Sequence, residues 1–248
     1  AISRRLGLIQ WIENSHTLRS LIEQQWKKEN TESDSLLTSK SALLHRNFIG
    51  GWSPSPTSVD YRNAIIRHER SSAVGAYNLQ VNAFGRHHLL RALAGCSLSA
   101  EKYISLRQGV LESLAILSGA CYVAGVGDRH LGNFLVDLER SSVISIDFGL
   151  VLGMGARLSV PELVPMRLTP QLTNLLRPAD GAAFFEKTLA RTLALLRDHS
   201  LSLRPLLNML VSEIRASVRS DRVPTLAAQL MEDKLYGFRS PGEILMDE

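Results

Sequence analysis

Cysteine is scarce in this 248-residue sequence, which contains only Cys96 and Cys121. So few cysteines exclude a small scaffold held together by disulfides. Both lie in apolar stretches, which predicts buried, reduced thiols and an intracellular setting. The length has room for one sizeable hydrophobic core.

Long apolar runs and blocks of like charge are also missing. No stretch approaches the roughly 18 uninterrupted apolar residues of a membrane span. Lys and Arg number 28 against 24 Asp and Glu, and the excess is spread along the chain. This balance is compatible with a nucleotide or nucleic acid partner but argues for neither. No group of cysteines and histidines has zinc-ligand spacing, so no metal other than magnesium or manganese is implied.

Apolar periodicity predicts a mainly helical chain with a few short strands. Leu6–Ile12 is expected to be a buried strand, and Thr17 is expected to cap the helix that follows it. Ser99 should cap a long helix that runs to about Tyr122. Its buried stripe is expected to be Tyr103, Leu106, Val110, Leu114, Leu117 and Cys121. Further helices are expected over 89–93, 169–176, 184–196, 203–214 and 225–235, and residues 30–60 are expected to form a long loop. The stripes expected to lie in the core are Phe184, Phe185, Leu189, Leu193 and Leu196 on one helix and Leu203, Leu206, Leu207, Leu210 and Ile214 on the next.

Residues 127–133 read GDRHLGN and residues 147–149 read DFG. Between them, residues 134–138 and 143–146 are short apolar runs separated by ERSS, a pattern that predicts a β-hairpin. A hairpin here would bring Asp128, Asn133 and Asp147 together at one of its ends.

Two carboxylates and a carboxamide in one place suit phosphoryl transfer from a magnesium nucleotide. Mg²⁺ prefers oxygen ligands, commonly one or two from protein with phosphates and water completing the shell, and Asn133 and Asp147 fit that role. Asp128 lies five positions before Asn133 (133 − 128 = 5), the spacing of the base and the metal ligand in a kinase catalytic loop. Asp-Phe-Gly alone is a common turn tripeptide, but its position after an apolar strand and 19 residues beyond Asp128 (147 − 128 = 19) favours a kinase site.

The segments GVGDRHLGN and VISIDFG resemble the catalytic and metal-binding segments of the phosphatidylinositol 3-kinase-related superfamily, which contains lipid kinases and giant Ser/Thr protein kinases. The likeness extends to LGLIQWIENSHTLRSLI upstream and VPELVPMRLTPQLTNLL downstream, and covers most of residues 4–178. Pro170 and Met166 depart from it, where the family usually has Arg and Phe. The giant protein kinases of DNA double-strand-break repair are the members most similar to this chain.

The resemblance implies an α+β, mainly helical fold: a protein-kinase-like C-terminal lobe of the PI3/PI4-kinase type, with a small β-hairpin at the catalytic site. Its core would be residues 1–178, followed by C-terminal helices over 179–248. Nothing before Leu6 resembles the phosphate-covering loop or the strand lysine of an N-lobe, and the chain opens at Ala1. We therefore expect the N-lobe to be absent and this chain to be part of a larger kinase polypeptide.

The resemblance also implies roles for individual residues. Asp128 would be the catalytic Asp, and Asn133 and Asp147 would bind Mg²⁺ or Mn²⁺ together with ATP. His130 would stabilise charge on the transferred phosphoryl group or shuttle the proton; the alternative is a structural histidine bonded to a backbone carbonyl. Leu135 and Ile146 would form the apolar floor under the adenine. Arg129 is expected to anchor the loop by ion pairing.

The implied activity is that of a Ser/Thr protein kinase in DNA repair, located in the nucleus, with protein substrates and partners that bind DNA ends. One alternative is a phosphoinositide lipid kinase, but residues 150–165 contain a single basic residue, Arg157, where a lipid kinase would meet head-group phosphates. The other alternative is an inactive scaffold that lacks the N-lobe.

Overall fold

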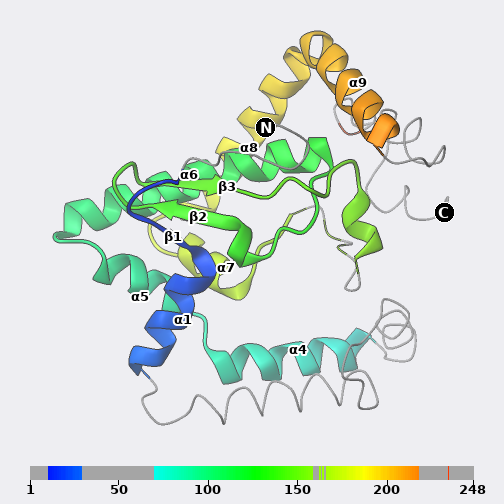
Figure 1. Cartoon of the computed structure of the whole chain (residues 1–248). Helices are drawn as coiled ribbons and strands as arrows, with labels where there is room; N and C mark the ends of the chain where they lie inside the picture. The colour runs from blue at the N-terminus through cyan, green and yellow to red at the C-terminus, as the bar shows by residue number, and fades with distance from the viewer. Residues whose placement is uncertain are drawn as a thin grey trace.

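The structure, a computed structural model, describes residues 11–29, 70–158, 162, 164, 166–217 and 234. These residues form helices packed around a small antiparallel sheet of order β1-β2-β3 (Figure 1). The strands are β1 (Ser15–Thr17), β2 (Phe134–Asp137) and β3 (Ser142–Ser145). The helices are α1 (Leu18–Glu29), α4 (Arg70–Phe84), α5 (His88–Gly95), α6 (Ala100–Ala124), α7 (Pro170–Leu176), α8 (Gly181–Asp198) and α9 (Ser200–Ser217), with 3-10 turns η1 (Leu131–Asn133) and η2 (Met154–Arg157). The predicted α+β, mainly helical fold class is confirmed.

The predicted hairpin is present as strands β2 and β3. Phe134 pairs with Ser145 and Val136 with Val143, so the two ends of the hairpin are fixed in register. Strand β1 completes the sheet on the other side of β2, where Ser15 pairs with Asp137. The strand predicted over Leu6–Ile12 lies outside the described residues apart from its last two positions, and neither of these is in a strand.

Helix α6 has the start and stop that its sequence predicts. The Ser99 hydroxyl accepts a hydrogen bond of 3.2 Å from the Lys102 amide, which caps the first turn. Gly125 caps the helix in the left-handed region at φ 58°, and the last helical residue, Ala124, lies two residues beyond the predicted end. The helix therefore delivers the chain directly into residues 127–133.

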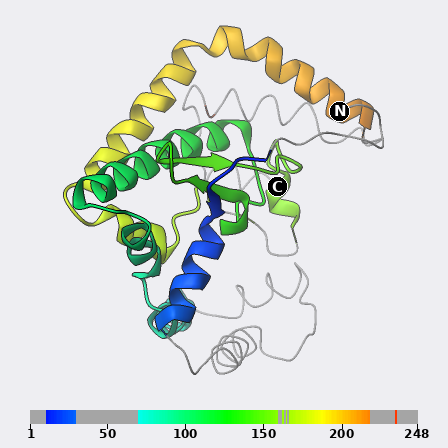
Figure 2. The same cartoon turned by 60° about the vertical axis from the view of Figure 1, so that its left-hand side comes forward.

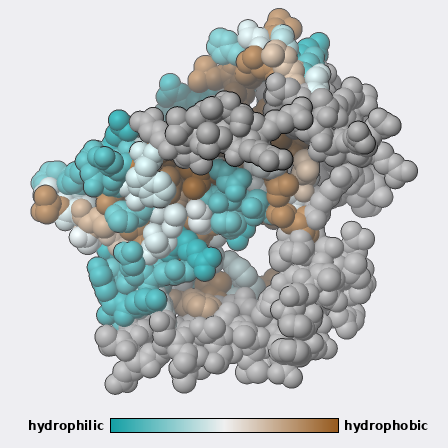
Figure 3. Space-filling view, viewed as in Figure 1, coloured by the Kyte–Doolittle hydropathy of each residue, from teal (hydrophilic) through white to brown (hydrophobic). Residues whose placement is uncertain are grey.

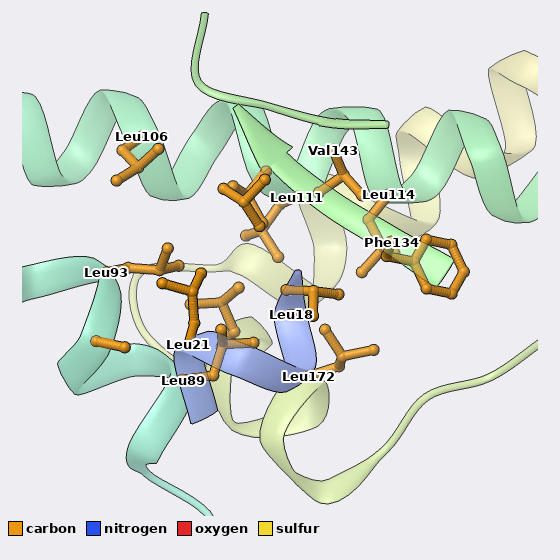
Figure 4. Packing of buried hydrophobic residues seen from close by; sticks show 14 of the residues in the cluster. Leu18, Leu21, Leu89, Leu93, Leu106, Leu111, Leu114, Phe134, Val143 and Leu172 are labelled. Carbon is orange, nitrogen blue, oxygen red and sulfur yellow. The ribbon is translucent and has the colours of Figure 1, made fainter. Parts of the chain in front are cut away.

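Leucines from four helices form the core against the inner side of β2 and β3 (Figure 4). In the predicted stripe of α6, Leu106, Val110 and Leu114 are buried, and Cys121 is half-buried. The remaining fully buried leucines lie on α1, α5, α6 and α7: Leu18, Leu89, Leu93, Leu111, Leu172 and Leu175. Each such side chain contributes roughly 1.5–3 kcal/mol of burial free energy, which holds α6 rigidly against the hairpin.

Two buried polar side chains connect α7 to its neighbours. Gln171 accepts from the Leu89 amide at 3.1 Å and so caps α5, whose own N-cap side chain makes no capping bond. Arg107 on α6 donates to the Leu175 carbonyl at 3.0 Å. Pro170, a departure from the family pattern, occupies the first turn of α7, where proline is favoured.

The predicted core assignment is wrong for part of the C-terminal helices. Phe185 on α8 is buried and Leu189, Leu193 and Leu196 are half-buried, but Leu206 on α9 is exposed. Figure 2 shows α9 continuing from the far end of α8 at an angle, at the edge of the described part of the molecule. The helix predicted over 225–235 lies outside the described residues except for position 234, as does the loop over 30–60.

The prediction of two buried cysteines is also wrong. Cys96 is exposed at the end of α5, Cys121 is half-buried on α6, and both are free thiols. Burial raises the pKa of the Cys121 thiol, and nearby Arg129 partly opposes that rise. Among the described helices, none combines the length and apolarity needed to cross a bilayer.

Candidate active site

The loop that follows α6 is held against the segment that follows the DFG tripeptide. The Gly127 amide donates to the Leu150 carbonyl at 2.8 Å, and the Gly153 amide donates to the Gly125 carbonyl at 2.9 Å. A Cβ at Gly127 would lie 2.5 Å from the Gly155 Cα, so this close approach requires glycine. The GDRHLGN loop and the segment after the DFG tripeptide therefore share one backbone scaffold.

Asp128 and Asp147 both adopt the left-handed backbone region, each at φ 58°. Few non-glycine residues have positive φ, and those that do often lie at functional sites where the surroundings hold them. Asp128 is half-buried, whereas Asp147 is exposed. Both carboxylates are thus displayed from backbone turns rather than from regular elements.

Asn133 links the loop to the hairpin. Its Nδ2 donates to the Asp128 carbonyl at 2.7 Å, and its own carbonyl accepts from the Ile146 amide at 3.0 Å. Asn133 is buried, and with its amide nitrogen engaged the free end of the carboxamide is Oδ1. The structure therefore connects Asp128, Asn133 and the start of the DFG turn by hydrogen bonds.

Arg129 binds both segments through its buried guanidinium. Nε donates to the Gly127 carbonyl at 2.8 Å, while Nη1 donates to Ser145 Oγ at 2.6 Å and to the Ile146 carbonyl at 3.1 Å. Nη2 donates to the Asp147 carbonyl. Arg129 does anchor the loop, but within the described part of the chain its guanidinium acts through hydrogen bonds to neutral acceptors and not through the expected ion pair.

His130 lies beside Asp128 with one nitrogen engaged. Its Nδ1 accepts from the Gly132 amide at 3.1 Å, so in the neutral ring the proton is on Nε2. Nε2 lies 4.0 Å from Asp128 Oδ1, and half of the side chain is exposed. The contact partner of Nδ1 is a backbone N–H and not the carbonyl of the structural alternative, and within the described residues Nε2–H has no hydrogen-bond partner.

The donor set fits a hard divalent cation. Asn133 offers an amide oxygen, and Asp147 offers a carboxylate of which one oxygen accepts from the Gly149 amide at 3.2 Å. Oxygen donors of this kind suit Mg²⁺ or Mn²⁺.

Leu135 is buried on the face of β2 opposite Phe134 and Val136, and it pairs with Ile144, two residues before Ile146. The assignment of Leu135 and Ile146 to an adenine floor stays a prediction.

The comparisons with known proteins begin with a family model described as phosphatidylinositol 3- and 4-kinase, which matches residues 1–219. The chain belongs to the phosphatidylinositol 3- and 4-kinase family. The resemblance to the related protein kinases is confirmed by the DNA-dependent protein kinase catalytic subunit of Xenopus laevis, 32% identical over 197 residues that cover 77% of this chain and 5% of that protein. The Ser/Thr protein kinase TOR2 of Saccharomyces cerevisiae is 30% identical over 207 residues, covering 83% of this chain and 8% of that protein. The chain therefore spans less than a tenth of the length of these relatives.

Among solved structures, the FAT and kinase domain of CtTel1 matches 96% of this chain with a TM-score of 0.69 and 21% identity, and this chain covers 16% of it. At that identity the likeness shows the fold alone. It agrees with the kinase-like arrangement of hairpin and helices described above.

Sequence reasoning gave no role to Glu162, although this residue lies within the downstream segment that carries the family resemblance. Glu162 Oε1 accepts from the Arg129 amide at 2.9 Å and lies 3.6 Å from Arg167 Nη1. The carboxylate thus connects the segment before α7 to the loop of residues 127–133. Its distance of 33 residues from Arg129 hides the contact in the sequence.

Proposed function

We propose that this chain carries the catalytic and metal-binding segments of a Ser/Thr protein kinase, which transfers the γ-phosphoryl group of ATP to a protein hydroxyl. The strongest support is the hydrogen bond from Asn133 Nδ2 to the Asp128 carbonyl. It fixes a candidate base and a candidate metal ligand in one loop, as phosphoryl transfer requires. Relatives named as protein kinases support the same reaction class.

In this proposal each residue acts at one atom. The Asp128 carboxylate accepts the proton of the attacking hydroxyl, and His130 Nε2–H donates to an oxygen of the transferred phosphoryl group. Asn133 Oδ1 and the Asp147 carboxylate hold Mg²⁺, which when bound neutralises charge on the phosphates. Leu135 and Ile146 support the adenine from below.

The lobe assignment extends this proposal. We assign residues 1–178 to the core of a kinase C-lobe and residues 179–248 to its C-terminal helices. The parts that cover the nucleotide phosphates would then come from polypeptide outside this chain, which agrees with the small share of the relatives that it spans. In isolation the chain would bind ATP weakly and transfer no phosphate.

A protein substrate fits better than a lipid. Residues 150–165, between the DFG tripeptide and α7, contain one basic residue, Arg157. Phosphoinositide head groups carry several negative charges and require a cluster of basic side chains. A lone arginine gives no such cluster.

A role in DNA repair is the more specific part of the proposal. It rests on relatives named DNA-dependent protein kinase catalytic subunit, and it carries with it a nuclear location and partners that bind DNA ends. The measurement is kinase activity with and without linear DNA and nuclear extract. Equal activity in both conditions contradicts DNA-end control but leaves the kinase assignment intact.

The test of the reaction uses the longest natural polypeptide that contains these residues. Asp128→Ala should lower phosphate transfer to a Ser/Thr peptide by about 10²–10⁴-fold, because it removes the base. Asp198→Ala, an exposed acid at the end of α8, is the matched control and should keep wild-type activity.

Offering phosphatidylinositol beside the peptide separates the two substrate classes. Transfer to the lipid and not to the peptide would favour the lipid kinase. A wild-type polypeptide that labels neither substrate would favour the inactive scaffold, and peptide labelling that survives Asp128→Ala would refute the catalytic assignment.

A further inference from the structure

A second cluster of metal-ligating side chains lies where α1 meets α5, away from the catalytic loop. Glu29 is the last residue of α1, His87 precedes α5, and His88 is the first residue of α5. Glu29 lies 58 residues before His87 in the sequence, so no spacing motif predicts that it meets the two adjacent histidines. In the space-filling view the surface over α1 is hydrophilic (Figure 3).

The two imidazoles face the same carboxylate oxygen. His87 Nε2 and His88 Nδ1 each lie 3.1 Å from Glu29 Oε2, and all three atoms lie within 4.8 Å of one another. When nitrogen and oxygen ligands surround a tetrahedral ion at about 2.0–2.2 Å, neighbouring ligand atoms are about 3.3–3.5 Å apart. The two nitrogen–oxygen distances are therefore close to the spacing of ligands that share one ion.

When the His88 ring is neutral, its inner nitrogen, Nδ1, carries no proton and cannot donate a hydrogen bond. Nε2 lies 2.6 Å from the Phe84 carbonyl, which only accepts, so Nε2 carries the proton. Nδ1 is buried, with the side chain 5% exposed, and it has no hydrogen-bond partner among the residues that the structure describes. Its approach to Glu29 has the distance of an ion pair but not the direction of a hydrogen bond. A buried unsatisfied nitrogen is rare, and a cation between it and the carboxylate would satisfy both.

Surrounding groups orient the cluster as outer-shell residues orient metal ligands. Glu29 Oε1 accepts from Gln25 Nε2 at 2.7 Å and lies 3.1 Å from Arg91 Nη1, which leaves Oε2 for the histidines. A histidine that donates its other N–H to a backbone carbonyl is a common outer-shell arrangement at metal sites.

We propose that Glu29, His87 and His88 form a three-ligand site for a divalent metal ion, with Zn²⁺ the ion that fits two imidazoles and a carboxylate best. The fourth position faces the half-exposed side of His87, where water completes the shell. The bound ion would join the C-terminal end of α1 to the N-terminal end of α5. It would thereby fix the strand and helix that precede the catalytic segments without taking part in phosphate transfer.

Zinc binding to the full chain, stripped of metal and purified in a Cys96→Ser background, tests the site. That background removes the exposed thiol, and excess Mg²⁺ saturates the oxygen-donor site at the DFG turn. Calorimetry should give one zinc ion per chain, and zinc should raise the midpoint of thermal unfolding. Co²⁺ in place of zinc should show the intense absorption of a tetrahedral complex.

Two variants and a control decide the outcome. His87→Ala and Glu29→Gln should each weaken zinc binding by at least 10- to 100-fold and abolish the zinc-induced rise in unfolding midpoint. His87 makes no capping bond, so His87→Ala should fold normally, which circular dichroism checks. His199→Ala, an exposed histidine after α8, should bind zinc as the wild type does. Zinc affinity unchanged in both variants, or no zinc binding by the wild type, would overturn the site and leave a protonated His88 paired with Glu29.

Discussion

Removing the guanidinium of Arg129 should destabilise the fold more than almost any other single change outside the apolar core. The side chain is 5% exposed and donates to four acceptors on three segments. Two of these acceptors belong to the buried residues Gly127 and Ser145. Asp147 is exposed, so its carbonyl can hydrogen-bond to water when the guanidinium is removed.

The expected magnitude follows from the two buried acceptors. Leaving a buried acceptor unpaired costs about 1–3 kcal/mol, so Arg129→Ala should lower the free energy of unfolding by roughly 2–6 kcal/mol. Summing all four bonds at the strength of charged hydrogen bonds would overestimate the loss of stability, because the exposed Asp147 carbonyl can hydrogen-bond to water in the variant. Arg129→Lys keeps the charge but loses the planar fork, so it should still cost more than about 1 kcal/mol.

Urea unfolding of the full chain, followed by circular dichroism, measures these losses, provided that the slope with urea is unchanged. Ser145→Ala removes one acceptor while Nη1 keeps the Ile146 carbonyl, so its cost should be about 1 kcal/mol. Arg19→Ala is the matched control, because its ion pair with Glu23 is exposed and worth at most about 0.5 kcal/mol.

Hydrogen exchange locates the effect. In Arg129→Lys the amides of residues 146–149 should exchange faster, because the Ile146 and Asp147 carbonyls lose the guanidinium that ties this segment to the loop. Amides in α6 should be affected less. An Arg129→Ala variant within about 0.5 kcal/mol of the wild type, with unchanged exchange at the DFG turn, would refute the view that this guanidinium holds the two catalytic segments together.

Three further changes have defined outcomes. Gly127→Ala should destabilise the chain by more than about 1 kcal/mol in urea unfolding, because its Cβ would lie 2.5 Å from the Gly155 Cα; an unchanged midpoint would mean that the backbones separate freely. Glu29 has its pKa lowered from 4.5 to about 2, so its carboxylate stabilises the fold above pH 4.5 and this contribution is lost as pH falls toward 2. Glu29→Gln should therefore flatten the pH dependence of unfolding in that window, and a profile that superposes on the wild type would contradict the linkage. Iodoacetamide should alkylate exposed Cys96 well before Cys121, whose pKa is raised by burial, and mass spectrometry that finds equal rates would contradict the described burial.

Local signals in the sequence predicted the elements that carry the site. Helix α6 has a hydroxyl cap at Ser99 and a glycine stop at Gly125, both of which act within one turn. The hairpin follows from two apolar runs and a polar turn. The spacing of Asp128 and Asn133 predicted their proximity for the same reason, since the contact spans only five residues.

Elements that depend on distant partners were not predicted. Strand β1 has the sequence SHT, which carries no strand pattern, and it forms because Ser15 pairs with Asp137 more than 120 residues later. Glu162 and the cluster around His88 depend on contacts of the same kind. Leu206 of α9 shows the opposite error, because an apolar stripe identifies the face of a helix that can be buried, not whether a partner covers it.

The position of Arg129 explains how the catalytic loop can hold its unusual backbone. Asp128 and Asp147 in the left-handed region cost of order 1–3 kcal/mol each, or roughly 2–6 kcal/mol together. This is comparable to the stabilisation worked out above for the buried acceptors of Arg129. Because Arg129 follows Asp128 directly and donates to the Asp147 carbonyl, the same side chain can offset the strain on both aspartates. The Arg129 guanidinium therefore links the left-handed backbone that exposes the two carboxylates to the stability of the loop.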